Sequence, residues 1–236
     1  MFTTEEVVRY SRQIILEDIG PEGQRQIKQG RVLVIGAGGL GCPVLQYLNA
    51  VGIGTLGIAE FDVVEATNLH RQILYRPSDI GRKKATAAIE VLHAHNPYTQ
   101  LVHHDIKVDE TNAAALVADY DLVVDGCDNF NTRYAVNDAC VQQGKPLVYG
   151  SILGFEGQVT VFNRDGSGQL RDLFPEPPDA DEVPSCSENG VLGTVPGIIG
   201  TIMAQAAIHI LLGQPSFEGR FLLLDTRSME RKVLSF

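Results

Sequence analysis

Basic residues are scarce in this sequence relative to acidic ones: 19 lysines and arginines stand against 29 aspartates and glutamates. The formal charge of −10 disfavours nucleic acid and anionic membranes as partners, because both repel an acidic surface. The first residues lack the basic segment and apolar run of a secretion signal. The longest apolar stretch, residues 191–212, is interrupted by glycine, proline, glutamine and histidine. It therefore predicts a buried helix with its lead-in loop, not a membrane span.

Cysteine is also scarce, and the four cysteines form no Cys-x-x-Cys pair. This usage predicts reduced thiols in a cytoplasmic protein, without a disulfide framework. Cys42, Cys127 and Cys140 lie in apolar surroundings typical of small buried side chains. Cys186 lies in a polar segment that we expect to be an exposed loop, where a thiolate near cations is reactive.

The most informative segment runs from Arg31 to Gly41. Residues 32–35 are apolar and predict a buried strand, and Gly36, Gly38 and Gly41 then match G-x-G-x-x-G ahead of a predicted helix. Between a strand and a helix, such glycines permit a tight turn and a close approach of the backbone to phosphate. We therefore predict a nucleotide-binding turn in preference to a purely structural one.

Strand and helix patterns alternate through the first 150 residues. Apolar strand patterns at 31–36, 55–60, 100–104, 121–125 and 146–150 are separated by helical patterns at 40–51, 83–95, 109–118 and 132–143. This alternation predicts an α/β fold with a doubly wound, mostly parallel, Rossmann-like sheet. Residues 156–163 alternate with period two, and together with 221–225 and 231–234 they predict antiparallel strands that extend the sheet.

We predict a single domain, residues 1–236, that begins with a helical arm over residues 1–30. Residues 164–190 are rich in proline, glycine and acidic side chains and have no sustained periodicity, which is typical of a functional lid or crossover loop. A helix over 196–212 is expected to pack back onto the sheet.

Polar clusters follow the ends of two predicted strands and open the next helix, where doubly wound sheets bind their ligands. They comprise residues 60–62, 67–72, 81–84 and 126–129. Together they offer an acidic acceptor for a ribose, several cations for phosphates and a carboxylate suited to Mg²⁺. A hydride-transfer enzyme does not need this combination, whereas an enzyme that breaks a triphosphate does.

Six motifs occur in order along the chain: Arg9-Tyr-Ser-Arg12-Gln, Gly36-x-Gly-Gly-Leu-Gly41, Thr67-Asn-Leu-x-Arg-Gln72, Gly81-x-x-Lys84, Asp128-Asn129 and Cys186-Ser-Glu-Asn-Gly-Val-Leu-Gly193. This series resembles the MoeB/ThiF/HesA branch of the ubiquitin-activating-enzyme-like adenylyltransferases. The resemblance covers the chain from about residue 5 to about residue 230.

The resemblance implies a reaction that uses ATP and Mg²⁺. The C-terminal Gly-Gly carboxylate of a ubiquitin-fold sulfur-carrier protein attacks the α-phosphate, which gives an acyl-adenylate and pyrophosphate. A separate sulfur donor then supplies the sulfur of a thiocarboxylate. The carrier serves either thiamine-thiazole or molybdopterin synthesis, and the Arg-Tyr-Ser-Arg-Gln start slightly favours thiamine. Relatives act as homodimers, and no nucleic acid or membrane partner is implied.

The resemblance also assigns roles to residues by position. Phosphate contacts and catalysis involve Arg12 (reaching the ATP of a neighbouring subunit), Arg71, Lys84, Asp128 (the Mg²⁺ residue) and Cys186 (the sulfur-handling cysteine). The nucleotide-binding set comprises Gly36, Gly38, Gly39, Gly41, Glu60 (on the ribose), Asp62, Asn68, Arg71, Gln72, Lys84, Asp128 and Asn129 (on the adenine side).

Several of these residues have a simpler interpretation. Arg12, with Arg9, could lie on a solvated helix face, and Lys84 could be a solvated helix residue beside its basic neighbours. Asp128 could serve only as the N-cap of the next helix. Glu60 stands where aspartate is more usual in relatives, and Cys186 could be a remnant that adenylation does not need.

No structural zinc is expected. Zinc-binding relatives carry two Cys-x-x-Cys pairs, and here the first place reads Gln169-Leu-Arg-Asp172 and the chain stops at Phe236 without a second pair. Two other functions remain open. An NAD-dependent oxidoreductase would explain the glycine turn and Glu60, and a non-catalytic module that docks a ubiquitin-fold protein would explain the missing zinc motif.

Overall fold

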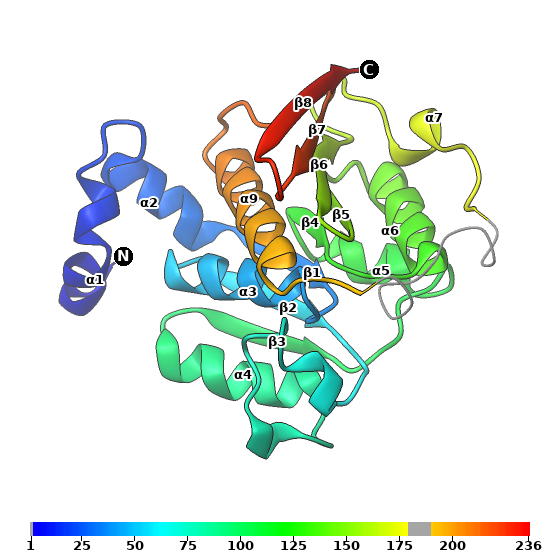
Figure 1. Ribbon diagram of the computed structural model, residues 1–236. Coiled ribbons are helices and arrows are strands. Elements are labelled where there is room, and N and C mark those ends of the chain that lie inside the picture. The colour runs from blue at the N-terminus through cyan, green and yellow to red at the C-terminus, as the bar shows by residue number, and fades with distance from the viewer. Residues whose placement is uncertain (1, 179–189) are drawn as a thin grey trace.

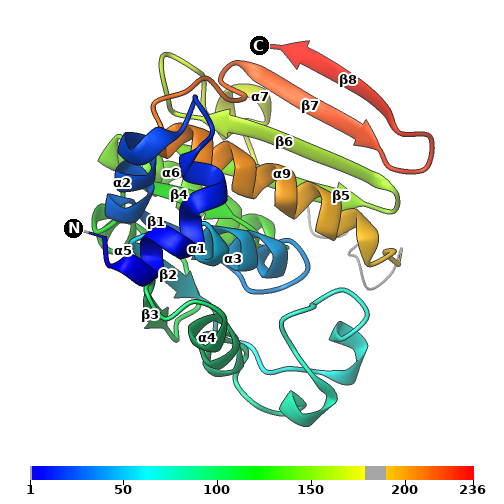
Figure 2. The same cartoon turned by 90° about the vertical axis from the view of Figure 1, so that its left-hand side faces the viewer.

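The computed structural model describes residues 2–178 and 190–236. Its centre is an eight-stranded sheet in the order β3-β2-β1-β4-β5-β6-β7-β8 (Figures 1 and 2). The strands are β1 (Arg31–Ile35), β2 (Thr55–Ala59), β3 (Gln100–His104), β4 (Leu122–Asp125), β5 (Leu147–Leu153), β6 (Glu156–Phe162), β7 (Arg220–Asp225) and β8 (Glu230–Ser235). Strands β1 to β5 pair in parallel, and β5 to β8 pair antiparallel. The predicted fold class is confirmed.

Helices cover both faces of the sheet. They are α1 (Thr4–Ile14), α2 (Gly20–Gln29), α3 (Gly41–Ala50), α4 (Lys84–His95), α5 (Ala113–Ala118), α6 (Phe130–Gln143), α7 (Leu170–Leu173) and α9 (Thr194–Leu211), with short 3₁₀ turns η1 (Ala66–Asn68) and η2 (Pro77–Asp79). Figure 1 shows α3 and α9 on one side of the strands and α5 and α6 on the other.

Two apolar cores follow from the alternation of side chains along the strands. In β1, Val32 and Val34 join the core beneath α3, α4 and α9, whereas Leu33 and Ile35 join the core beneath α5 and α6. All four side chains are almost completely buried, as expected for a central parallel strand covered on both faces. This packing fixes the carboxyl end of β1, where the glycine turn begins.

The N-terminal arm consists of two helices that are separated by residues 15–19, and the second begins at Gly20, which has a φ of +59°. A capping box between Thr3 and Glu6 begins α1, and the Lys28 ammonium holds the Glu6 carboxylate at 2.5 Å. The buried Tyr10 hydroxyl accepts a hydrogen bond of 2.9 Å from the Asn96 side chain, just beyond α4. The arm is therefore attached to the α3–α4 side of the molecule.

Helix α9 has the length and hydropathy of a membrane span, with a mean hydropathy of 1.5 over 18 residues. It nevertheless packs between α3 and strands β5 and β6, and Val195, Ile199 and Met203 are fully buried. The prediction of a buried helix that packs back onto the sheet is confirmed.

The boundaries of β5 and α5 differ from the sequence expectation by three residues or more. Strand β5 continues to Leu153 because it forms a hairpin with β6, in which Leu153 pairs with Glu156. Helix α5 begins at Ala113, not at residue 109, because the Asp109 side chain accepts the Thr111 amide in a local turn.

Candidate functional site

The glycine turn connects β1 to α3 and requires glycine at both of its ends. Gly36 has a φ of +85°, a conformation that side chains with a Cβ atom rarely adopt. A Cβ atom on Gly41 would lie 2.0 Å from the Gly36 carbonyl oxygen, so the turn closes onto itself. The loop after β4 contacts this turn, because the Gly126 amide donates to the Ile35 carbonyl at 2.9 Å. The ends of β1 and β4 therefore form one edge of the site.

Two side chains hold Ala37, in the middle of the turn. The Ala37 amide donates to Glu60 Oε2 at 2.9 Å, and the Tyr75 hydroxyl donates to the Ala37 carbonyl at 2.8 Å. Glu60 Oε1 accepts the amides of Phe61 and Asp62, at 2.8 and 2.9 Å. The buried Glu60 carboxylate thus anchors backbone on two loops, and its contact with a ribose stays a prediction. Sequence reasoning missed Tyr75, whose place three residues beyond Gln72 gave no signal of this contact.

Lys84 is buried in spite of its charge. It begins α4, its amide donates to the Asp62 carbonyl at 2.9 Å, and its ammonium lies 3.1 Å from Asp62 Oδ2. Only 6% of Lys84 is exposed, so the interpretation of a solvated helix residue is wrong. The adjacent Lys83 has that character instead, because its side chain is 47% exposed.

The segment 66–72 lies against the glycine turn. A Cβ atom on Gly39 would lie 3.6 Å from Arg71 Cδ, and one on Gly38 would lie 3.6 Å from Gln72 Nε2. Arg71 Nη1 donates to the Thr67 carbonyl at 3.0 Å. Gln72 is 4% exposed, and its Oε1 has no hydrogen-bond partner among the described residues. The turn, one cation and one unsatisfied amide oxygen therefore meet here.

Asn68 has mainly a backbone contact in this chain. Its Oδ1 accepts the Glu65 amide at 3.1 Å, and the residue is 7% exposed. Its predicted contact with phosphate is not shown by this arrangement and stays a prediction.

The beginning of α9 completes the surroundings of the turn. A Cβ atom on Gly193 would lie 2.1 Å from the His70 carbonyl oxygen, and one on Gly39 would lie 3.2 Å from Pro196. The chain that leaves residues 164–190 therefore returns beside the predicted nucleotide turn. Cys186 itself lies outside the described residues, and its role stays a prediction.

The loop after β4 distinguishes Asp128 from Asn129. The Asn129 side chain accepts the Thr132 amide at 2.8 Å and caps α6, so Asp128 is not the N-cap. Asp128 is exposed, and its carboxylate has no hydrogen-bond or ion-pair partner in the described part of the chain. A free carboxylate beside the glycine turn suits Mg²⁺, which binds through one or two carboxylates together with substrate phosphates and water.

A structural zinc site, which the sequence predicts to be absent, needs several protein ligands, unlike a Mg²⁺ ion that binds together with ATP. Within residues 2–178 and 190–236, no group of three or more histidine, cysteine or acidic side chains is placed to hold a metal ion. The residues described thus offer a carboxylate for a metal that arrives with a nucleotide, and no closed set of protein ligands.

A buried ion pair under this loop was not foreseen from the sequence. The Arg133 Nε lies 3.1 Å from Asp125 Oδ2, and both residues are buried, at 6% and 0% exposure. Burial opposes the charge on Arg133, but the Asp125 carboxylate together with Tyr149 and Cys127 outweighs it, and the pKa of the arginine is raised overall. Only the three-dimensional fold brings the end of β4 and the first turn of α6 together in this way.

The three described cysteine thiols are buried and unreactive. Cys42, Cys127 and Cys140 are buried, as the sequence predicted. Burial raises the pKa of Cys42 to about 12 and also raises the pKa of the other two thiols. They therefore remain protonated thiols at neutral pH and are unsuited to nucleophilic chemistry.

Arg12 lies in the N-terminal arm, outside the segments that carry Arg71, Lys84 and Asp128. It is exposed near the end of α1. Figure 1 shows α1 at one end of the molecule and α6, which follows Asp128, at the other. Its predicted contact with the nucleotide of a neighbouring subunit stays a prediction.

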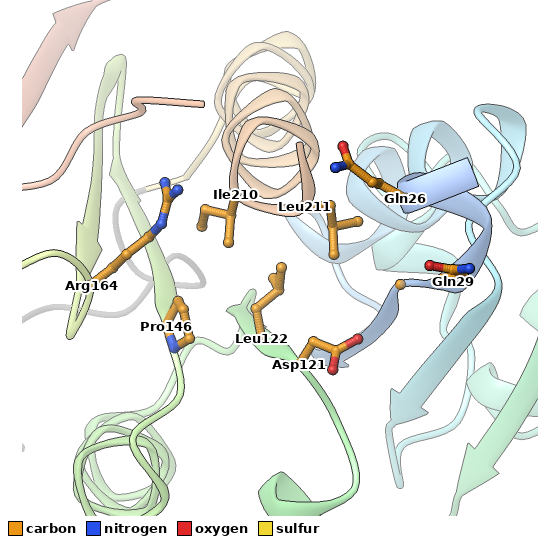
Figure 3. Close-up of a pocket in the computed structure, with 9 residues that line it drawn as sticks. Gln26, Gln29, Asp121, Leu122, Pro146, Arg164, Ile210 and Leu211 are labelled. Carbon is orange, nitrogen blue, oxygen red and sulfur yellow. The ribbon is translucent and has the colours of Figure 1, made fainter. Parts of the chain in front are cut away.

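A cavity of about 540 Å³ lies at the opposite edge of the sheet (Figure 3). Gly30, Leu122 and Pro146 line it just before or at the start of β1, β4 and β5, whereas the glycine turn follows the other end of β1. Arg164 also lines it and pairs with the Glu218 carboxylate. None of the predicted site residues within 2–178 and 190–236 borders this cavity.

Comparison with known proteins gives a consistent family relationship. The sequence pattern of the ThiF family matches residues 10–236. The sulfur carrier protein adenylyltransferase of Thermus thermophilus is 49% identical over 230 residues, which cover 95% of this chain and 85% of that protein. The probable adenylyltransferase/sulfurtransferase MoeZ of Mycobacterium tuberculosis is 47% identical over 236 residues, with coverages of 98% and 60%. The chain spans about half of the adenylyltransferase and sulfurtransferase MOCS3 of Aedes aegypti, at 48% identity.

Solved structures share the fold. E. coli MccB with ATP superposes with a TM-score of 0.84 at 20% identity, over 96% of this chain and 71% of that one. PaaA superposes with a TM-score of 0.82 at 23% identity, over 99% and 74%.

Proposed function

The chain belongs to the ThiF family, and from this premise we propose that it is an ATP-dependent adenylyltransferase acting on a ubiquitin-fold sulfur-carrier protein. The observation that supports the proposal is that Arg71 lies against the glycine turn, and that the loops leading to Lys84 and Asp128 contact the same turn through Glu60 and Gly126. Cations beside a phosphate-binding turn, with a free carboxylate for Mg²⁺, are what the cleavage of a triphosphate needs.

In the proposed reaction, a carboxylate oxygen of the carrier's C-terminal glycine attacks the α-phosphorus of ATP. The bond between the α-phosphorus and the bridging oxygen breaks, and pyrophosphate leaves with that electron pair. Arg71 and Lys84 offset the negative charge on the phosphates, and Asp128 would hold a Mg²⁺ ion that supplies further positive charge there. The backbone amides of the glycine turn and the N-terminus of α3 favour the anionic nucleotide.

The Lys84–Asp62 pair prepares the cation for this role. Asp62 fixes the ammonium at 3.1 Å while its own side chain remains 50% exposed. The lysine is therefore oriented and partly desolvated without being enclosed by the carboxylate. An ammonium in that state binds phosphate more strongly than one surrounded by water.

Sulfur chemistry follows the adenylation. We assign it to a separate donor, with Cys186 as the sulfur-handling or carrier-linking residue. The proposal covers carriers of both the thiamine and the molybdopterin pathways, and assays with one carrier of each kind decide between them.

Arg12 leads us to propose a homodimer, because it is exposed on α1 and the family resemblance assigns it to the nucleotide of a neighbouring subunit. Mixing Arg12→Ala protein with Lys84→Ala protein places one intact site in each mixed dimer. We expect partial recovery of activity, and stable mixed dimers without recovery would contradict the shared site.

The direct test of the function is carrier-dependent exchange of pyrophosphate into ATP. We expect exchange with the wild-type chain and its loss in Asp128→Ala. The matched control is Asp119→Ala, which removes an exposed aspartate on the approach to β4 and leaves exchange unchanged. Full exchange in Asp128→Ala would reject the magnesium assignment. Tight NADH binding without ATP binding would favour an oxidoreductase, and nucleotide binding without acyl-adenylate would favour a docking module.

A further inference from the structure

Arg133 binds the carbonyl of Cys127, the residue that immediately precedes Asp128. Its Nη2 donates to the Cys127 carbonyl at 2.9 Å and to the Gly150 carbonyl at 3.0 Å, and its Nη1 donates to the Tyr149 hydroxyl at 2.9 Å. One guanidinium therefore connects the loop after β4 to the middle of β5.

Asp125 completes the arrangement from the other side. Its Oδ1 accepts the Cys127 amide at 3.0 Å, and its Oδ2 lies 3.1 Å from Arg133 Nε without the alignment of a hydrogen bond. Both polar backbone atoms of Cys127 are thus held by members of one buried ion pair.

Asp128 has no such support of its own. Its carboxylate is exposed and without a partner among the described residues, and the residue after it caps α6. The position of that carboxylate consequently depends on the Cys127 peptide before it and the helix cap after it.

Arginine is the residue type that this arrangement demands. Its planar fork presents several N–H donors in fixed directions, whereas lysine offers one compact ammonium on a flexible stem. A lysine at this position cannot reach the Cys127 carbonyl, the Gly150 carbonyl and the Tyr149 hydroxyl at once. The ring of Tyr149 adds a second constraint, because the guanidinium lies 4.6 Å from its centroid.

We propose that Arg133, acting with Asp125, is a positioning residue for the nucleotide site, which fixes the Cys127 peptide and thereby places the Asp128 carboxylate for the magnesium of Mg-ATP. This inference rests on the proposed function. A residue that served only stability would be needed equally with and without magnesium, whereas a residue that acts through Asp128 matters mainly when magnesium is present.

The test is a double-mutant cycle read by calorimetry, with ATP titrated in Mg²⁺ and in EDTA. We expect Arg133→Lys to weaken Mg-ATP binding by about tenfold and to change binding of metal-free ATP by less than about twofold. In an Asp128→Asn background, we expect Arg133→Lys to add less than about twofold in Mg²⁺. Arg164→Lys is the matched control, since Arg164 is a largely buried, ion-paired arginine at the opposite edge, and it should leave both affinities unchanged.

Tyr149→Phe provides a milder variant that retains the ring and removes one acceptor of Arg133. It should weaken ATP binding in Mg²⁺ by only about twofold to threefold and leave ATP binding in EDTA unchanged. Equal weakening of both ATP forms, or equal weakening in both Asp128 backgrounds, would overturn the inference. A lowered thermal midpoint with unchanged Mg-ATP affinity would also overturn it. A wild-type chain that binds no Mg-ATP would instead reject the proposed function, and this inference with it.

Discussion

Replacing Lys84 by methionine separates the binding of phosphate from the stability of the fold. Methionine retains most of the aliphatic stem of a side chain that is only 6% exposed, and it removes the ammonium that lies 3.1 Å from Asp62 Oδ2. The Asp62 side chain is 50% exposed, so water can solvate it after the substitution. The change therefore removes a cation without leaving a buried, unpaired charge.

Two magnitudes follow from this geometry. An ion pair with a half-exposed partner contributes about 0–1 kcal/mol, so we expect a small fall in the free energy of unfolding. A hydrogen bond from a charged donor to a phosphate contributes about 1.5–3 kcal/mol. At 1.4 kcal/mol for each factor of ten, Mg-ATP binding should weaken by about 10-fold to 150-fold.

Calorimetry with Mg-ATP and with adenosine, together with urea unfolding, measures both effects. Adenosine should bind the variant and the wild type with similar affinity because it carries no phosphate. Lys83→Met is the matched control: its neighbouring ammonium bonds to the Phe61 carbonyl and to Asp105 on the surface, so Mg-ATP binding should change by less than about twofold. Equal losses of Mg-ATP binding in the two variants, or none in Lys84→Met, would refute the reasoning.

Three further predictions concern the surroundings of the site. Gly41→Ala should destabilise the protein by at least about 2 kcal/mol in urea unfolding, because its Cβ atom would lie 2.0 Å from a carbonyl oxygen; Gly197→Ala, where no atom lies within 4 Å, should stabilise α9 by up to about 1 kcal/mol. The hydrogen bonds from Arg171 lower the pKa of Asp138 below its ordinary 3.8. The stabilisation that they provide is therefore complete above pH 3.8 and is lost as the pH falls through the lowered pKa. An NMR titration should show the pKa of Asp138 rising again in Arg171→Gln, and an unchanged pKa would contradict the pairing. The Cys42 thiol, with a pKa of about 12, should resist alkylation at pH 8 until the protein is unfolded, as mass spectrometry of the labelled peptides would show; rapid labelling of the folded protein would contradict its burial.

Much of the fold is predictable because each parallel strand is a short apolar run bounded by turn-forming residues. Strand β3 has the predicted boundaries, and β1 differs by one residue. The glycine turn is predictable for a related reason, since Gly36 and Gly41 must be glycine for local steric reasons that the sequence records directly.

The parts that escaped prediction depend on contacts between distant segments. The sequence suggests Asp128 as a possible cap of the following helix, whereas the backbone conformation makes the neighbouring Asn129 the cap of α6. The ion pair of Asp125 with Arg133 arises from the way α6 folds back beside β4, and no pattern in a single sequence records that approach.

Glu60 illustrates how a sequence can locate a residue without recording the backbone contacts that it makes. The spacing from the glycine turn places an acidic residue at the tip of β2, and the structure has it there. The carboxylate accepts the Ala37 amide at 2.9 Å, a contact that the longer side chain of glutamate makes.

The central claim is that the glycine turn, with Arg71, Lys84 and Asp128, holds Mg-ATP. A crystal structure of the chain grown with Mg²⁺ and a non-hydrolysable ATP analogue tests it most directly. We predict that the triphosphate lies along residues 36–41, within hydrogen-bond distance of Arg71 and Lys84, with Mg²⁺ bound to Asp128. A triphosphate bound elsewhere, for example in the cavity at the opposite edge of the sheet, would contradict the account.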